Sequence, residues 1–191
     1  MPRVSQEQAK LNRQRVVAAA AALFRERGLH GVGVADIMAA AGLTHGGFYG
    51  QFANKDALAV EALDSALVED RQGTVEALIA DYLSLAHVQN PGTGCPLAAL
   101  ANDVAREPTG SPVRARFAKG VEGLAARLAG LTPRLSRARR RQHSLAALST
   151  LVGAVVLARA VDDPALRTDL LEAAAAAAAP ERPAGRSLRA E

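Results

Sequence analysis

The chain has 191 residues, 49% of them hydrophobic and 22% charged, and its formal net charge is +4. A chain of this length can bury a sizeable core without disulfides, and its single cysteine, Cys95, excludes an intrachain disulfide and any zinc site built on paired cysteines. Because only 3% of the residues are aromatic and tryptophan is absent, the core must consist mainly of small aliphatic side chains, a composition that favours helices.

Two features of the sequence argue against secretion and membrane insertion. Polar and charged residues interrupt the N-terminal segment, so it has no apolar run of the signal-peptide kind. The longest uncharged run in the apolar C-terminal half, residues 144–158, is shorter than the roughly 18 to 20 residues that cross a bilayer. We therefore expect a cytoplasmic protein with no membrane partner.

Positive charge is concentrated at two places. Residues 1–15 contain four basic residues and one glutamate, a net charge of +3. A second run, residues 134–141, contains five arginines and no acidic residue. Either run can be an ordinary solvated helix end or part of a surface that binds anions, and the sequence leaves the role of the second run open.

Apolar residues at helical spacing, separated by short breaks, predict an all-α chain. In the first seventy residues we expect a long helix over 6–27, a short one over 34–41, another of about seven residues from His45, and a long one over 54–71. Thr44 and Asn54 are suited to cap the last two of these helices. The later breaks predict helices over 75–89, 96–107, 113–130, 135–160 and 165–178.

Two short helices joined by a tight turn and packed on a longer one form the helix-turn-helix pattern, whose second helix can enter the DNA major groove. In that second helix Phe48 and Phe52 share an inward face, whereas Gly46, Gly47 and Gly50 cover the outer face. Each glycine costs about 1 kcal/mol relative to alanine, and close approach to DNA would explain that cost. The alternative is that these glycines mark an irregular loop.

The stretch from Val34 to Leu58 is similar to the DNA-binding domain of the tetracycline-repressor (TetR) family of transcription regulators. The residues that carry the resemblance are Asp36-Ile37, Ala40-Ala41-Gly42-Leu43-Thr44, Gly46, Phe48-Tyr49, Phe52 and Lys55-Asp56-Ala57-Leu58. The motif covers about residues 9–58. Farther along, Gly94-Cys95-Pro96-Leu97 and the stretch 151–165 resemble one branch of this family, in which the larger domain binds a small ligand.

The resemblance implies an N-terminal three-helix DNA-binding domain over 1–54 and a helical ligand-binding and dimerisation domain over 55–179. The proline and glycine content of residues 180–191 predicts a disordered tail. The resemblance further implies that Thr44, His45 and Gly46 start the recognition helix and that Tyr49 and Lys55 contact phosphates. The candidates for reading bases are His45, Gln51 and Thr44. The expected DNA-binding residues are Thr44, His45, Gly46, Gly47, Tyr49, Gln51, Lys55, Arg3, Lys10 and Arg13. Gly33 and Gly47 depart from the threonine or serine common in the family, so the operator sequence is not predicted.

A DNA-binding helix of this length reads few base pairs, so we expect a homodimer. Apolar stripes on the last two long helices are the expected dimer surface, as the resemblance also implies. Its residues are Leu148, Leu151, Val152, Val155, Val156, Leu166 and Leu170. The alternative is that both stripes are buried within one monomer.

A pocket for a small, mainly apolar effector is expected among the helices 75–89, 96–107 and 113–130. The expected ligand-binding residues are Tyr82, Leu85, His87, Cys95, Leu100, Val104, Phe117 and Val121. Most of these are equally suited to a plain core. Cys95 precedes a helix start, where the dipole can lower the pKa of a thiol, so it is either a redox sensor or a small core residue.

The sequence has no motif typical of a metal site, a nucleotide-binding loop or a nucleophilic enzyme, so we expect neither a cofactor nor enzymatic activity. The function expected is that of a dimeric transcriptional regulator, a repressor that a small molecule releases from a double-stranded DNA operator. The alternative is a helical protein-interaction module that keeps the fold without binding DNA.

Overall fold

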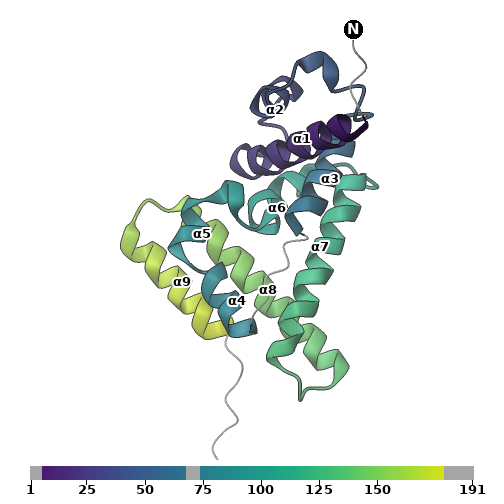
Figure 1. The fold of residues 1–191 in the computed structure, drawn as a ribbon. Helices are drawn as coiled ribbons and strands as arrows, with labels where there is room; N and C mark the ends of the chain where they lie inside the picture. The colour runs from purple at the N-terminus through teal and green to yellow at the C-terminus, as the bar shows by residue number, and fades with distance from the viewer. Residues whose placement is uncertain (1–5, 68–73, 179–191) are drawn as a thin grey trace, which may run out of the picture.

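The computed structural model describes residues 6–67 and 74–178, and these residues form helices and connecting turns with no strand among them. Figure 1 shows α1 and α2 at one end of the molecule and α8 and α9 at the other, with α7 running between the two ends. The α-helices are α1 (Gln6–Arg27), α2 (Val34–Ala40), α3 (Lys55–Leu67), α4 (Val75–Tyr82), α5 (Leu85–Gln89), α6 (Pro96–Arg106), α7 (Pro112–Leu128), α8 (Arg137–Ala160) and α9 (Pro164–Ala178). Short 3₁₀ turns are η1 (His45–Gly47), η2 (Pro91–Thr93) and η3 (Ala129–Leu131). The all-α prediction is confirmed.

Two expected helices differ from the structure. The helix expected over 75–89 is broken into α4 and α5, because the Ser84 hydroxyl accepts a hydrogen bond from the His87 N–H and starts a new helix. The helix expected from His45 is a single 3₁₀ turn followed by further turns, as the helix-breaking effect of three glycines explains. The expected tail over 180–191 lies outside the described residues.

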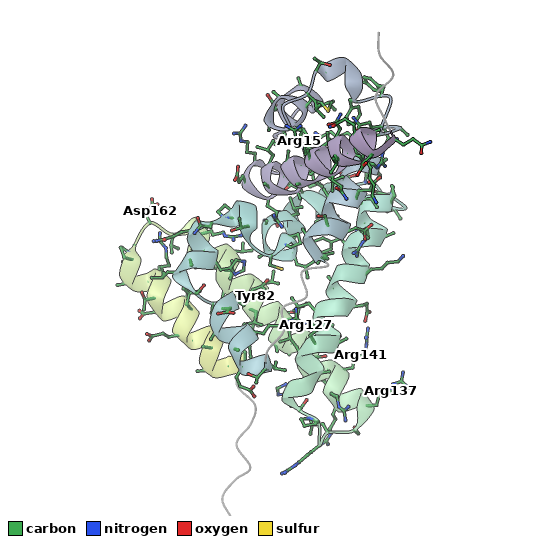
Figure 2. All side chains as sticks on the ribbon, viewed as in Figure 1. Arg15, Tyr82, Arg127, Arg137, Arg141 and Asp162 are labelled. Atoms are coloured by element: carbon green, nitrogen blue, oxygen red, sulfur yellow. The ribbon has the colours of Figure 1, made fainter. Side chains whose placement is uncertain are left out.

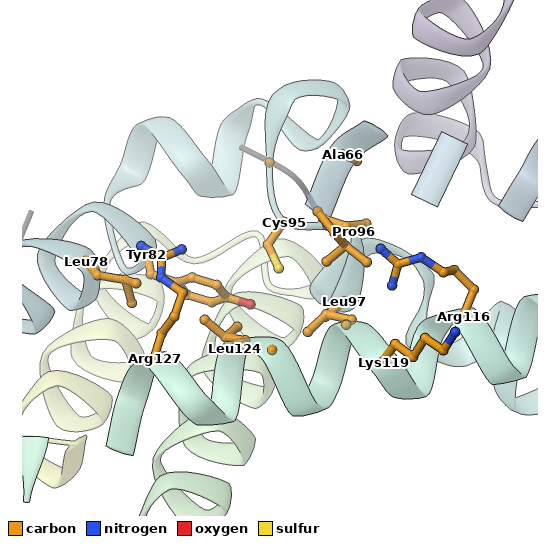
Figure 3. Close-up of a pocket in the computed structure, with 14 residues that line it drawn as sticks. Ala66, Leu78, Tyr82, Cys95, Pro96, Leu97, Arg116, Lys119, Leu124 and Arg127 are labelled. Carbon is orange, nitrogen blue, oxygen red and sulfur yellow. The ribbon is translucent and has the colours of Figure 1, made fainter. Parts of the chain in front are cut away.

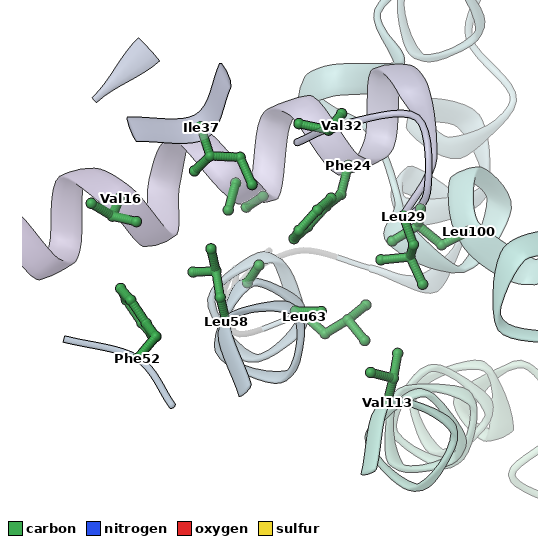
Figure 4. Packing of buried hydrophobic residues seen from close by; sticks show 14 of the residues in the cluster. Val16, Phe24, Leu29, Val32, Ile37, Phe52, Leu58, Leu63, Leu100 and Val113 are labelled. Carbon is green, nitrogen blue, oxygen red and sulfur yellow. The ribbon is translucent and has the colours of Figure 1, made fainter. Parts of the chain in front are cut away.

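The first of two hydrophobic cores lies beneath the N-terminal helices. Phe24 of α1, Ile37 of α2 and Leu58 of α3 are buried in it (Figure 4). Leu100 of α6 and Val113 of α7 extend the same core. The N-terminal domain expected to end at residue 54 is therefore packed continuously against the next helices, and α3 belongs to its core.

The second core is formed by residues from all the helices between α4 and α9, these two included. Leu97, Leu128 and Leu151 are buried where α6, α7 and α8 meet. By length and composition alone α8 could cross a membrane, but it packs on α7 and α9 and buries one face in this core. Because α6 and α7 contribute to both cores, they connect the two ends of the molecule.

Candidate nucleic-acid interface and small-molecule cavity

Residues 45–52, called here the recognition segment, are anchored by two phenylalanines. Phe48 is 1% and Phe52 3% exposed, and their rings stack with centroids 5.5 Å apart. The Phe52 N–H donates to the Phe48 carbonyl at 3.0 Å, which keeps the two rings one turn apart. Tyr49, which directly follows Phe48, points the other way. Its side chain is 68% exposed, and its ring touches the Phe48 ring edge-on.

The outward face of the recognition segment presents small polar groups. Thr44, His45 and both following glycines are exposed. Thr44 caps η1 with its backbone only, since within the described chain its hydroxyl makes no capping hydrogen bond. The His45 ring lies edge-on to the Tyr49 ring with centroids 6.2 Å apart. Hydroxyl and imidazole groups on an exposed turn can reach phosphates and base edges.

The glycines of the recognition segment are not required by the protein's own backbone or packing. None of Gly46, Gly47 and Gly50 has a positive φ. A Cβ on Gly46 would meet no heavy atom of the described chain within 4 Å, and a Cβ on Gly47 would make an ordinary 3.5 Å contact with Met38. The turn glycine Gly42 differs, because its φ is +70°. The space above the recognition segment is therefore open to another molecule.

Arg13 was expected to contact DNA, but its side chain contacts other parts of the protein. Its guanidinium forms an ion pair with Glu61 of α3, donates to the Gln51 carbonyl, and lies 4.2 Å from the centroid of the Phe52 ring. Arg13 therefore ties α1 to α3 and to the recognition segment. Lys10, one turn earlier, is exposed, and Arg3 lies outside the described residues.

Two further expected DNA contacts are turned toward the protein. The Gln51 amide donates weakly to the Gly47 carbonyl at 3.5 Å, and its Oε1 is buried without a hydrogen-bond partner among the described residues. The Lys55 ammonium lies 5.8 Å from the centroid of the Phe24 ring. Both side chains must rotate to reach DNA, whereas the capped start of α3, where Asn54 accepts from the Ala57 N–H at 2.8 Å, is already formed.

The second basic run lies far from the recognition segment. Figure 2 shows Arg137 and Arg141 at the opposite end of the molecule from Arg15, which lies on α1. Arg141 forms a two-pronged ion pair with Glu122 of α7, with both N–O distances 2.8 Å. This run is therefore separate from the candidate DNA surface.

A cavity of about 270 Å³ lies between the end of α3, α4, the start of α6 and the length of α7. Figure 3 shows the Tyr82 hydroxyl and the Cys95 thiol directed toward its middle, between Leu97 and Leu124. The residues that line it are Ala66, Leu67, Leu78, Tyr82, Gly94, Cys95, Pro96, Leu97, Arg116, Lys119, Gly120, Gly123, Leu124 and Arg127. The cavity lies in the region where the sequence predicted an effector pocket.

Of the eight expected ligand-binding residues, only Tyr82 and Cys95 line this cavity. Leu85 is half exposed on the surface, because the break before α5 turns it outward. Leu100 and Val104 belong to the first core. Phe117 and Val121 pack against the second core without lining the cavity.

His87, the remaining expected ligand residue, has a structural role. Its Nε2 accepts from the Cys95 N–H at 2.9 Å, which leaves Nδ1 as the protonated nitrogen facing the Tyr82 carbonyl at 2.5 Å. Both ring nitrogens are therefore used to hold the turn before α6. Arg159 of α8 closes this arrangement by donating to the carbonyls of His87 and Val88, and burial lowers the pKa of Arg159.

The sequence interpretation missed the cations of the cavity. Arg116, Lys119 and Arg127 line it from α7. They are spaced at three and eleven residues, which places them on one helical face. That periodicity was readable in the sequence, but which face of α7 meets the cavity depends on how α3 and α6 pack against it.

The expected dimer residues divide into two groups. Leu148, Leu151 and Val155 are buried in the core of the protomer, because α8 turns this face toward α7 and α9, and they are closed to a second copy. The remaining four stay wholly or partly exposed, and so does Leu157, which the sequence interpretation had omitted. The exposed and half-exposed apolar residues on this surface are Val152, Val156, Leu157, Leu166 and Leu170.

Comparison with known proteins agrees with the geometry of the N-terminal end. The family model described as bacterial regulatory proteins, tetR family, matches residues 16–62. An uncharacterized HTH-type transcriptional regulator of Mycobacterium tuberculosis strain H37Rv is 34% identical over 168 residues, which cover 77% of this chain and 84% of that protein.

Solved structures share the fold over nearly the whole chain. A TetR-family transcriptional regulator from Cytophaga hutchinsonii is similar with a TM-score of 0.69 and 21% identity, over 93% of this chain and 96% of that chain. A TetR-family transcriptional regulator from Agrobacterium tumefaciens has a TM-score of 0.70 and 16% identity, over 88% of this chain and 97% of that one. At these identities the likeness concerns the fold alone.

Proposed function

Because the chain belongs to the tetR family of bacterial regulatory proteins and is a DNA-binding transcriptional regulator, we propose that it acts as a dimeric repressor on a palindromic operator and releases it when a small molecule binds. The protein would work in the cytoplasm, where its operator is, and by binding rather than catalysis. Two-fold symmetry would place one recognition segment on each half-site.

The main support for this DNA-binding site is the contrast between buried and exposed residues within the recognition segment. Phe48 is buried, while its neighbour Tyr49 is 68% exposed beside exposed glycines that leave room above them. In this proposal Thr44 and Tyr49 bind phosphates, and His45 reads a base edge. Glycine removes the Cβ atoms that would hold the protein surface away from the DNA.

Lys10 is proposed to steer the N-terminal end of α1 toward the phosphate backbone. A lysine that neutralises one phosphate contributes about one unit to the dependence of log affinity on log salt concentration. Arg13 has a positioning role instead, because it holds the Gln51 carbonyl and the Phe52 ring in place.

The DNA-binding proposal is tested by sequencing genomic fragments retained by the purified protein and measuring their affinity by mobility shift. Tyr49→Ala should weaken selective binding without changing thermal stability. Lys10→Ala should reduce the salt slope by about one, whereas Arg139→Ala, which removes a cation from the far end of the molecule, should leave the slope unchanged. Retention of fragments without sequence selectivity would instead favour a protein-interaction module.

The dimer proposal is tested with two exposed leucines. Leu157 of α8 is 52% and Leu85 of α5 50% exposed. Leu157→Glu should convert the dimer to a folded monomer in analytical ultracentrifugation, because it places a charge in the proposed interface. Leu85→Glu is the matched control and should remain dimeric, and a dimer that survives both substitutions would move the interface away from α8.

A further inference from the structure

The cavity beside α7 is lined by positively charged side chains as well as by apolar ones. Its lining includes Arg116, Lys119 and Arg127, while none of the lining residues in the described part of the chain is acidic. Leu67, Leu78, Pro96, Leu97 and Leu124 form the apolar part of the wall. Arg116 is the most shielded of the three cations, with a side chain 16% exposed, whereas Lys119 and Arg127 are exposed. A shielded cation attracts an anion more strongly than the same cation does in water, because the local dielectric constant is lower.

We propose that the effector is a small anionic amphiphile, a monocarboxylate with an apolar body, which binds with its carboxylate at Arg116 and Lys119. This inference rests on the proposed ligand-responsive function. Figure 3 shows both side chains at the same end of the cavity, beside Leu97. A guanidinium can hold a carboxylate through two parallel hydrogen bonds, and an ammonium adds a point charge.

The size of the cavity limits the apolar body. A volume of about 270 Å³ lies at the small end of the range for ligand pockets, which favours a short chain or a single ring. The α7 face contributes Gly123, where a Cβ would meet no heavy atom of the described chain within 4 Å. A larger side chain at this position would therefore occupy the space that the apolar body needs.

The proposed carboxylate position also suggests how the ligand affects DNA binding. Arg116 forms an ion pair with Asp64 of α3, and the Arg116 side chain is only 16% exposed. A ligand carboxylate at Arg116 competes with Asp64 for the same guanidinium. One turn before Asp64, Glu61 of the same helix holds Arg13, which donates to the Gln51 carbonyl of the recognition segment. A shift of α3 on loss of the Asp64 contact would thus reach the recognition segment through Glu61 and Arg13.

The ligand class is tested by thermal unfolding of the full chain with octanoate, phenylacetate, octanamide and octylamine. We expect both carboxylates to raise Tm and the amide and amine to bind about tenfold more weakly or worse, since a charge-assisted hydrogen bond is lost. Arg116→Gln and Lys119→Gln should remove the preference for octanoate over octanamide, whereas the distant control Arg139→Gln should keep it. The proposal is overturned if neither carboxylate raises Tm, or if octanamide or octylamine stabilises as well.

Gly123→Leu tests whether these ligands bind in the cavity. This variant should abolish the octanoate shift while its own unfolding stays cooperative, and a shift that persists would place the carboxylate elsewhere and overturn the proposal. Operator affinity is then measured with and without octanoate. A fall in affinity supports the Asp64 link, whereas an unchanged affinity alongside a normal Tm response overturns that link alone. Failure of the protein to bind any DNA selectively would refute the proposed function and leave the Tm result intact.

Discussion

Gly46 of the recognition segment and Gly120 of α7 differ in what surrounds them. A Cβ on Gly46 would meet open space, but a Cβ on Gly120 would lie 2.7 Å from Leu67 Cδ1 and 3.2 Å from Leu97 Cδ2. Gly120 thus lies in a crowded place, where α3, α6 and α7 converge. Gly46, by contrast, leaves space that no part of the described chain fills, and under the proposed function that space admits DNA.

The largest expected effect separates the two faces of the recognition segment. Phe48→Ala should lower the free energy of unfolding by about 3–5 kcal/mol, because a fully buried aromatic side chain is replaced by a cavity. Tyr49→Ala, one residue along, should change it by no more than about 0.5 kcal/mol. Urea unfolding followed by circular dichroism measures both, and similar losses for the two variants would contradict the assigned faces.

A second prediction concerns the crowded glycine of α7. Gly120→Val should lower the free energy of unfolding by about 1–3 kcal/mol, since its branched side chain overpacks Leu67 and Leu97. Gly123→Val is the control on the same helix and should leave stability unchanged or slightly higher. Equal effects at the two positions, measured in the same urea titrations, would remove the distinction between crowded and open glycines.

A third prediction tests the open glycines. Gly46→Ala and Gly47→Ala should keep the stability of the protein or raise it by up to about 1 kcal/mol, because neither Cβ meets a close contact. Both variants should nevertheless bind the operator more weakly in a mobility-shift assay. Gly123→Ala is the control, because it stabilises the helical backbone in the same way at a position away from the DNA. Unchanged operator affinity in all three variants would show that the open space has no role in binding.

The smallest effect is expected at the exposed ion pair between α7 and α8. Arg141 lowers the pKa of Glu122, so any stability from this pair is present above the ordinary pKa of a glutamate and is lost as the pH falls through the lowered value. Both side chains are more than half exposed, so Glu122→Gln should produce no resolvable change of Tm at neutral pH and physiological salt. A clear loss would show that α7 and α8 depend on this contact.

Local sequence signals predicted much of the DNA-binding end correctly. The inward positions Phe48 and Phe52 followed from helical spacing, although the segment is a 3₁₀ turn with further turns rather than a helix. The role of Arg13 could not be read in this way. Its partner Glu61 is 48 residues away, and only the packing of α1 on α3 brings the two together.

The ligand residues were harder to predict because the cavity is built from helices distant in sequence. Tyr82 and Cys95 were identified, but Leu100 and Val104 proved to belong to the other core. The break at Ser84 also turned Leu85 outward and gave His87 a structural task. Each of these outcomes depends on which helix face meets which neighbour, and helical periodicity alone leaves that choice open.

By itself the sequence determined the all-α class, most helix boundaries and the motif of the DNA-binding end, because these depend on residues within a few turns of one another. Only the tertiary structure decided which charges pair, which face of α7 lines the cavity, and which leucines of α8 remain on the surface. These properties arise from contacts between helices far apart in the chain, and such contacts decide whether a given glycine or arginine serves the fold or a partner.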